Sequence, residues 1–91
     1  MAIKSITSSG TFNIKQGIGQ IRQLSCSNAG TSWTLKILDG PDSNGNTQVI
    51  YGGTSPGTIT TGLVLFTPLY FRDGIQVITS GTAGELEVDY L

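Results

Sequence analysis

The chain has 91 residues, enough for one small domain, and a chain of this length buries about 60 to 65% of the surface that its unfolded form exposes. Five scattered basic and six acidic residues give a net charge of -1, which argues against nucleic acid or an anionic membrane as a partner. The sequence lacks histidine, which excludes Ser-His-Asp and Cys-His catalysis and the usual zinc sites, and its one cysteine cannot form an intrachain disulfide.

Short segments rich in β-branched and aromatic residues, separated by turn-forming residues, predict strands along the whole chain. The first, residues 3–7, is either a short strand or an arm. The others are residues 11–14, 20–27, 33–38, 47–51, 58–60, 63–66, 69–71, 75–79 and 85–90. No segment has helical periodicity. We therefore predict one all-β domain, residues 1–91: an antiparallel β-sandwich, jelly-roll-like, with about eight short strands, in which residues 1–10 could form an N-terminal arm.

The turns between these segments have recognisable sequences. Asn28-Ala29-Gly30 predicts a hairpin before the strand that contains Trp33. Residues 40–46, with an Asn-Gly pair, predict a surface loop, and Pro56-Gly57 suits a type II turn. Residues 80–84 predict the final turn.

Alternation within the strands predicts which side chains are buried. Trp33, Leu35 and Ile37 share one face of their strand and are expected in the core. Leu38 interrupts the polar alternation of the other face, which suggests that this face is also covered. In residues 20–27, Ile21 is out of phase with Leu24 and Cys26, which predicts a bulge. Residues 63–66 are apolar on both faces and are expected to be among the most buried.

The last segment alternates most regularly. Leu86, Val88 and Tyr90 are expected to face the core, and the acidic residues between them, Glu85, Glu87 and Asp89, to face water. We interpret this acidic row as the solvated edge of a sheet, which discourages aggregation, rather than as a pair of catalytic carboxylates.

Three other features suggest chemistry, but each has a simpler structural explanation. The oxygen-bearing side chains around residues 40–46 invite a calcium site, yet the EF-hand spacing fails, and such residues commonly cap turns. This set is Asp39, Asp42, Asn44 and Asn46. Gly17-Ile18-Gly19 predicts a turn, because no helix follows to bind phosphate. Cys26 is expected to pack as a small apolar side chain. We predict no enzyme, no catalytic residue, no metal and no cofactor.

The aromatic residues leave one binding function open. Trp33, Tyr51 or Tyr70 could form a stacking platform for a carbohydrate, although a sandwich of this size needs most of its aromatic side chains in the core. Tyr51 and Tyr70 lie near predicted loops and are the two expected to be exposed.

Residues 19–40 and 70–90 resemble a pattern that is common in small virion proteins of tailed bacteriophages. The shared motifs are the Asn28-Ala29-Gly30-Thr31 turn, a Thr-Leu-x-Ile-x-Asp-Gly strand over residues 34–40, and a final Thr-Ser-Gly-Thr-Ala hairpin over residues 79–83. Trp33 departs from the pattern, which often has a small residue there. The resemblance implies a β-sandwich head decoration or cement protein that assembles as an oligomer, most commonly a trimer, and clamps neighbouring subunits of the major capsid protein.

The same resemblance implies a location on the phage head after synthesis in the cytoplasm of the bacterial host. The sequence has no apolar run of signal-peptide length and none long enough to span a membrane, which agrees with this expectation. Residues 1–11 are expected to reach the shell, so that deleting residues 1–10 would abolish shell binding and leave the sandwich folded. The expected partner-interface residues are Ile3, Lys4, Ile6, Trp33, Tyr51 and Tyr70. A neck, tail or fibre component is the alternative within the virion.

Overall fold

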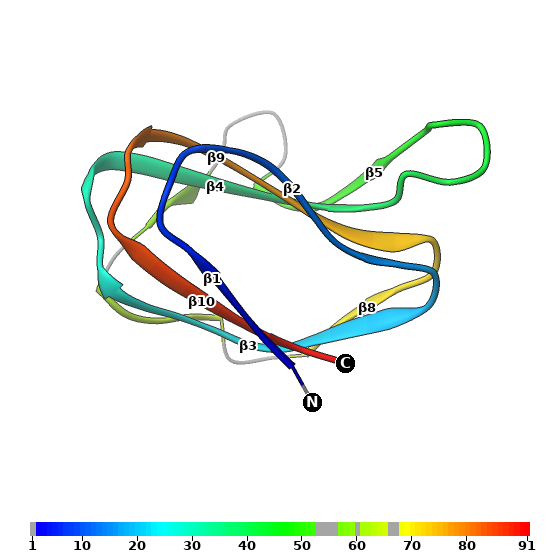
Figure 1. Cartoon of the computed structure of the whole chain (residues 1–91), viewed down its shortest axis with the longest axis horizontal. Coiled ribbons are helices and arrows are strands. Elements are labelled where there is room, and N and C mark those ends of the chain that lie inside the picture. The colour runs from blue at the N-terminus through cyan, green and yellow to red at the C-terminus, as the bar shows by residue number, and fades with distance from the viewer. Residues whose placement is uncertain (1, 53–56, 60, 66–67) are drawn as a thin grey trace.

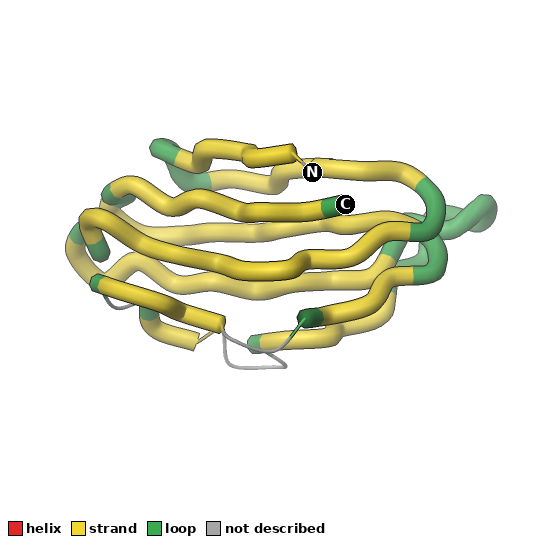
Figure 2. Tube along the Cα trace, turned by 90° about the horizontal axis from the view of Figure 1, so that it is seen from below, coloured by secondary structure: helices red, strands yellow, loops and turns green. Residues whose placement is uncertain are grey.

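Two antiparallel sheets stack face to face in the computed structural model, which describes residues 2–52, 57–59, 61–65 and 68–91 (Figure 1). One sheet, here sheet A, contains β1 (Ala2–Ile6), β10 (Glu85–Tyr90), β3 (Gly19–Asn28), β7 (Gly62–Leu65) and β8 (Leu69–Phe71). The other, sheet B, contains β2 (Gly10–Gln16), β9 (Gly74–Thr82), β4 (Thr31–Asp39), β5 (Gln48–Tyr51) and β6 (Gly57–Thr58). The strands run along the molecule and the turns gather at its two ends (Figure 2).

The strand order is that of a jelly roll. Sheet A has the order β1-β10-β3-β7 and sheet B the order β2-β9-β4-β5, so that β1 to β4 alternate between the sheets. At one edge of each sheet, two short strands share a single place. In sheet A, β7 and β8 both pair with β3. In sheet B, β5 and β6 both pair with β4. Counted by position, the ten strands of the described residues occupy eight places. The predicted antiparallel sandwich of about eight strands is confirmed.

The core lies between the sheets and contains the side chains that the alternation predicted. Trp33, Leu35 and Ile37 are buried together with Ile21, Leu24 and Cys26 from sheet A. Leu38, on the opposite face of β4, is only 5% exposed and pairs in register with Val49 of β5 and Gln76 of β9. The outer face of sheet B is therefore covered at Leu38, as predicted.

The bulge predicted in residues 20–27 is also confirmed. The pairing of β3 with β10 runs from Gln23 opposite Asp89 to Ile21 opposite Tyr90, so β3 has one extra residue between them. This extra residue shifts the alternation and lets both Ile21 and Leu24 point into the core.

Two expectations about the terminal strands need correction. Of the two alternatives for residues 3–7, the strand is confirmed, because Ala2–Ile6 pairs with β10. Deleting residues 1–10 would therefore remove a strand and the fully buried Ile6, which corrects the expectation that this deletion leaves the sandwich folded. The final turn lies within the expected residues 80–84 but is shorter, because β9 continues to Thr82 and only Ala83 and Gly84 separate it from β10. The acidic strand β10 is not a sheet edge, since it lies between β1 and β3.

Two other expectations lie outside the described residues. They are the burial of the side chains in residues 63–66 and the type II turn at Pro56-Gly57. Among the described residues there is no helix, and so none that could span a membrane.

Candidate functional site

Three surface hollows lie at one end of the sandwich, which we call the Tyr70 end. It is formed by the β2–β3 turn at residues 17–18, the β4–β5 loop at residues 40–47 and the β8–β9 turn at residues 72–73 (Figure 1). The largest hollow, about 420 Å³, is lined by Ile18, Asp39, Gln48, Tyr70, Phe71 and Arg72. A second, about 230 Å³, is lined by Lys15, Ile18, Gly19, Gln20, Tyr70 and Leu91. Tyr70 and Ile18 line both hollows.

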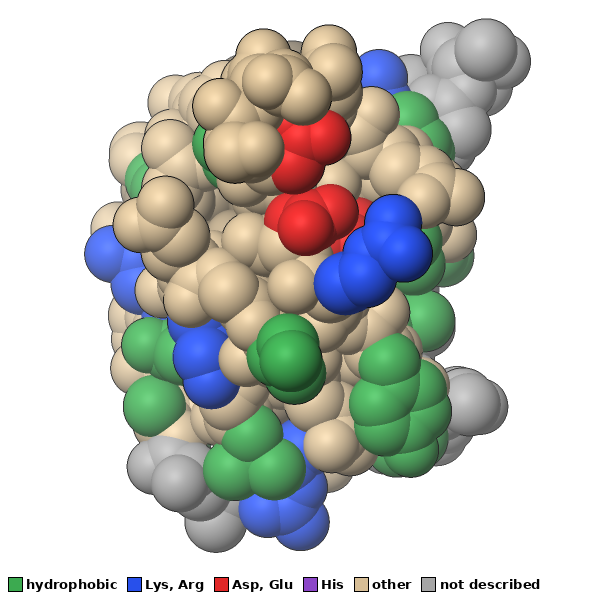
Figure 3. All heavy atoms as spheres, turned by 90° about the vertical axis from the view of Figure 1, so that its right-hand side faces the viewer, with side chains coloured by type: hydrophobic (Ala, Val, Ile, Leu, Met, Phe, Trp, Pro, Cys, Tyr) green, Lys and Arg blue, Asp and Glu red, His purple; other side chains and the backbone are tan. Residues whose placement is uncertain are grey.

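Three of the five large hydrophobic side chains that are exposed among the described residues lie at the Tyr70 end. Ile18 is 80% and Tyr70 73% exposed, and Leu91 beside them is also exposed. Figure 3 views this end directly and shows hydrophobic side chains in its lower half, basic side chains beside them and acidic side chains above. An exposed aromatic ring next to both charge signs is a common composition for a binding surface.

The Asp39 carboxylate holds this end together. Its Oδ2 accepts a hydrogen bond from the backbone N–H of Arg72 at 3.0 Å, and its Oδ1 accepts from Asp73 at 2.8 Å and Gly74 at 3.3 Å. Burial raises the pKa of Asp39, but these three donors and the Arg72 guanidinium outweigh it and hold the pKa below its ordinary value of 3.8. Asp39 therefore fixes the β8–β9 turn as an ionised side chain.

Asp42, in the loop whose oxygen-bearing side chains suggested calcium, also binds backbone N–H groups through its carboxylate. Asp42 Oδ1 accepts hydrogen bonds from the backbone N–H of Asn44 at 2.8 Å and of Asn46 at 2.9 Å. The loop is closed by a bond from Asp42 N–H to the Asn46 carbonyl. Within the described residues, no three Cys, Asp or Glu side chains form a group that could hold a metal ion. Both carboxylates thus have the turn-capping role that the sequence favoured.

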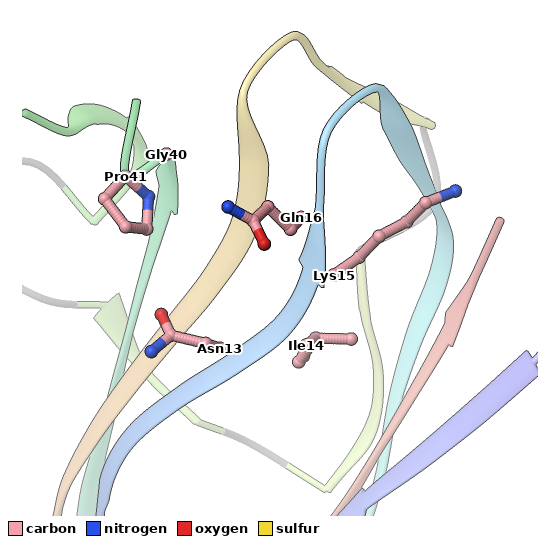
Figure 4. A pocket seen from close by; sticks show the side chains of 6 residues that line it. All are labelled: Asn13, Ile14, Lys15, Gln16, Gly40 and Pro41. Atoms are coloured by element: carbon pink, nitrogen blue, oxygen red, sulfur yellow. The ribbon is translucent and has the colours of Figure 1, made fainter. Parts of the chain in front are cut away.

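A third hollow, about 350 Å³, lies between edge strand β2 and Gly40-Pro41, which are joined by a cis peptide bond. Figure 4 shows Asn13 and Gln16 on the side of β2 that faces Pro41, while Lys15 points the other way. Asn13 Oδ1 already accepts a hydrogen bond from Gln76 Nε2 at 2.8 Å. The lining of this hollow contains no aromatic side chain. It is therefore less suited to hold a ligand than the hollow of about 420 Å³ that Tyr70 lines.

The six predicted interface residues divide into exposed and buried ones. Ile3 and Lys4 are exposed on β1, and Tyr70 is exposed on β8. Tyr51 is half-buried and packs against the core, so its expected exposure is only partly met. Ile6 and Trp33 are fully buried, which corrects their assignment: neither can contact a partner directly.

Sequence reasoning missed most of the Tyr70 end. The sequence pattern places Ile18 in a turn and does not mark Gln48 or Arg72 as site residues. A large apolar residue between two glycines was the available signal, because a turn gives such a side chain no core to enter.

The prediction that Cys26 packs in the core is confirmed. Burial raises the pKa of the Cys26 thiol, and a backbone hydrogen bond at Asn28 lowers it by a smaller amount. The raised pKa disfavours the nucleophilic thiolate.

Comparison with models of known families and with curated proteins found no match for this chain.

Proposed function

We propose that the protein is a structural component of a phage virion, which decorates the outer surface of the head and stabilises contacts between subunits of the major capsid protein. The observation that carries this proposal is the exposed edge strand β1, on which Ile3 and Lys4 are both accessible. The sequence motifs shared with small virion proteins supply the identity of the partner. The role is non-enzymatic and the protein acts as an oligomer, with a trimer as the expected form.

β1 is the sheet edge best suited to receive another chain. It pairs with β10 through five consecutive positions without a register shift. Edge strand β2 contains a shift between Asn13 and Lys15, and each of the other two edges consists of two short strands. An uninterrupted edge offers a row of backbone N–H and C=O groups to a strand of a partner. Ile3, which is 62% exposed, adds an apolar contact beside that row.

The number of copies per virus particle tests the location. Quantitative mass spectrometry of purified particles of the source virus, referred to the major capsid protein, should give a fixed ratio near the number of capsid subunits. A handful of copies would instead place the protein at the neck, tail or fibre. Absence from the particle would refute a virion role altogether.

Variants of β1 test the contact itself. Ile3→Glu places a charge on the exposed edge, and we expect it to reduce binding to undecorated heads in a sedimentation assay. Val49→Glu, at the exposed edge strand β5, is the matched control and should bind as the wild type does. Equal binding of both variants would refute the role of β1 without affecting the copy-number result.

A further inference from the structure

The outer surface at β8 combines an exposed ring with polar residues at neighbouring positions of β8 and β3. Tyr70 and Arg72 are two residues apart and both exposed, whereas Phe71 between them is buried in the core. Gln20 of β3 lies opposite Tyr70 in the strand register and lines the smaller hollow. Tyr70 therefore has Arg72 as its neighbour along the outer face of β8 and Gln20 as its neighbour across the strand pair.

The polar groups of the larger hollow retain hydrogen-bonding capacity. The Arg72 side chain is 84% exposed, and its ion pair with Asp73 is long, with 3.9 Å between Nε and Oδ2. Asp39 Oδ2 accepts one backbone hydrogen bond, which leaves this oxygen able to accept another. Gln48 is exposed and adds an amide that both donates and accepts.

The fixed position of Asp39 favours binding of a small ligand. Its carboxylate is held by three backbone hydrogen bonds, which also fix the backbone of the turn that carries Arg72. A group that is already held in place loses less conformational entropy on binding. The hollow, about 420 Å³, is open to solvent, so a ligand would lie on its surface rather than be enclosed.

We propose that the Tyr70 end binds a neutral saccharide, with one sugar ring packed on the Tyr70 side chain and its hydroxyl groups bound by Asp39, Gln48 and Arg72. A pyranose ring has an apolar face of C–H groups, which suits an exposed aromatic ring and the neighbouring Ile18. Its hydroxyl groups both donate and accept hydrogen bonds, which suits a hollow that contains a carboxylate, an amide and a guanidinium. Because opposite charges lie side by side in this hollow, a neutral polyol fits it better than an ion does.

This binding site does not depend on the proposed role in the virion. If the protein is also present in many copies on a shell, weak binding at each copy adds up to strong attachment to a glycan-coated surface.

Amide NMR spectra of the full chain, titrated with glucose, galactose, mannose, N-acetylglucosamine and N-acetylgalactosamine up to high millimolar concentrations, test the proposal. We expect at least one of these sugars to cause saturable shifts at residues 18, 20, 48 and 70–72. Tyr70→Ala should weaken binding by about tenfold or more, while Tyr70→Phe, which keeps the ring, should change it far less. Gln48→Ala should also weaken binding.

Ile3→Ala is the matched control, because it removes an exposed apolar side chain that lines neither hollow, and it should bind the sugar normally. Tryptophan fluorescence and urea unfolding of each variant verify that the fold is kept. The proposal is overturned if no sugar of the panel gives saturable shifts, or if Tyr70→Ala binds as the wild type does. Loss of head binding by Tyr70→Ala without any sugar binding would instead assign this end to a protein partner.

Discussion

Asp39 is a polar side chain that stabilises a turn distant from it in the sequence. Its carboxylate holds the backbone of residues 72–74, which are more than thirty positions away in the chain. We expect Asp39→Ala to lower the free energy of unfolding by about 1 to 3 kcal/mol near neutral pH, since hydrogen bonds to a charged group are lost. Urea unfolding followed by circular dichroism measures this difference.

The contribution of Asp39 should depend on pH in a defined direction. Because its pKa is lower in the folded protein than the ordinary value of 3.8, its stabilisation is fully present above that value. The stabilisation is lost as the pH falls below 3.8 through the folded pKa. The difference between wild type and Asp39→Ala should therefore shrink in acid, and an equal difference at neutral and strongly acidic pH would contradict this account.

Trp33 is the largest fully buried side chain of the core, and its Nε1 has no hydrogen-bond partner among the described residues. Trp33→Ala should cost about 3 to 5 kcal/mol of stability, because it leaves a cavity between the sheets. Trp33→Phe should cost less, since a ring still fills part of the space and an unpaired N–H is removed. Urea unfolding of both variants tests the order; a larger loss for Trp33→Phe would be incompatible with it.

At the scale of single elements, β1 offers a matched pair of isoleucines. Ile6 is fully buried between the sheets, whereas Ile3 is largely exposed on the same strand. Ile6→Ala should therefore lower the free energy of unfolding by about 2 to 5 kcal/mol, and Ile3→Ala should change it by less than about 0.5 kcal/mol. Thermal or urea unfolding distinguishes them. Similar losses for both would mean that β1 does not pair as described.

The strands could be predicted from the sequence because burial on one face imposes a period of two, which is visible within any five residues. Even the bulge in β3 was readable, since Ile21 and Leu24 can share a face only if one extra residue lies between them. The position of β10 was not readable. Its acidic alternation is the same whether it lies at an edge or between β1 and β3, because only its outer face contacts water in either case.

The Tyr70 end could not be predicted for a related reason. It brings together residues 15, 18–20, 39, 48, 70–72 and 91, which are far apart in the sequence and meet only because a jelly roll gathers its turns at two ends. Tyr70 was recognised as an exposed aromatic residue near a loop. Its neighbours were not, because no local pattern relates Asp39 or Gln48 to β8.

The whole molecule should unfold in one step. Both sheets contribute to a single core, in which Trp33 and Leu35 of sheet B pack with Leu24 and Val88 of sheet A. The chain also passes repeatedly between the sheets, so the central strand of each sheet is paired with strands that lie far away in the sequence. Tryptophan fluorescence reports only on Trp33 in sheet B, whereas circular dichroism reports on both sheets. The two urea transitions should therefore have the same midpoint and slope. If fluorescence changed at a lower urea concentration than circular dichroism, sheet B would open separately, and the common core would not be the main source of stability.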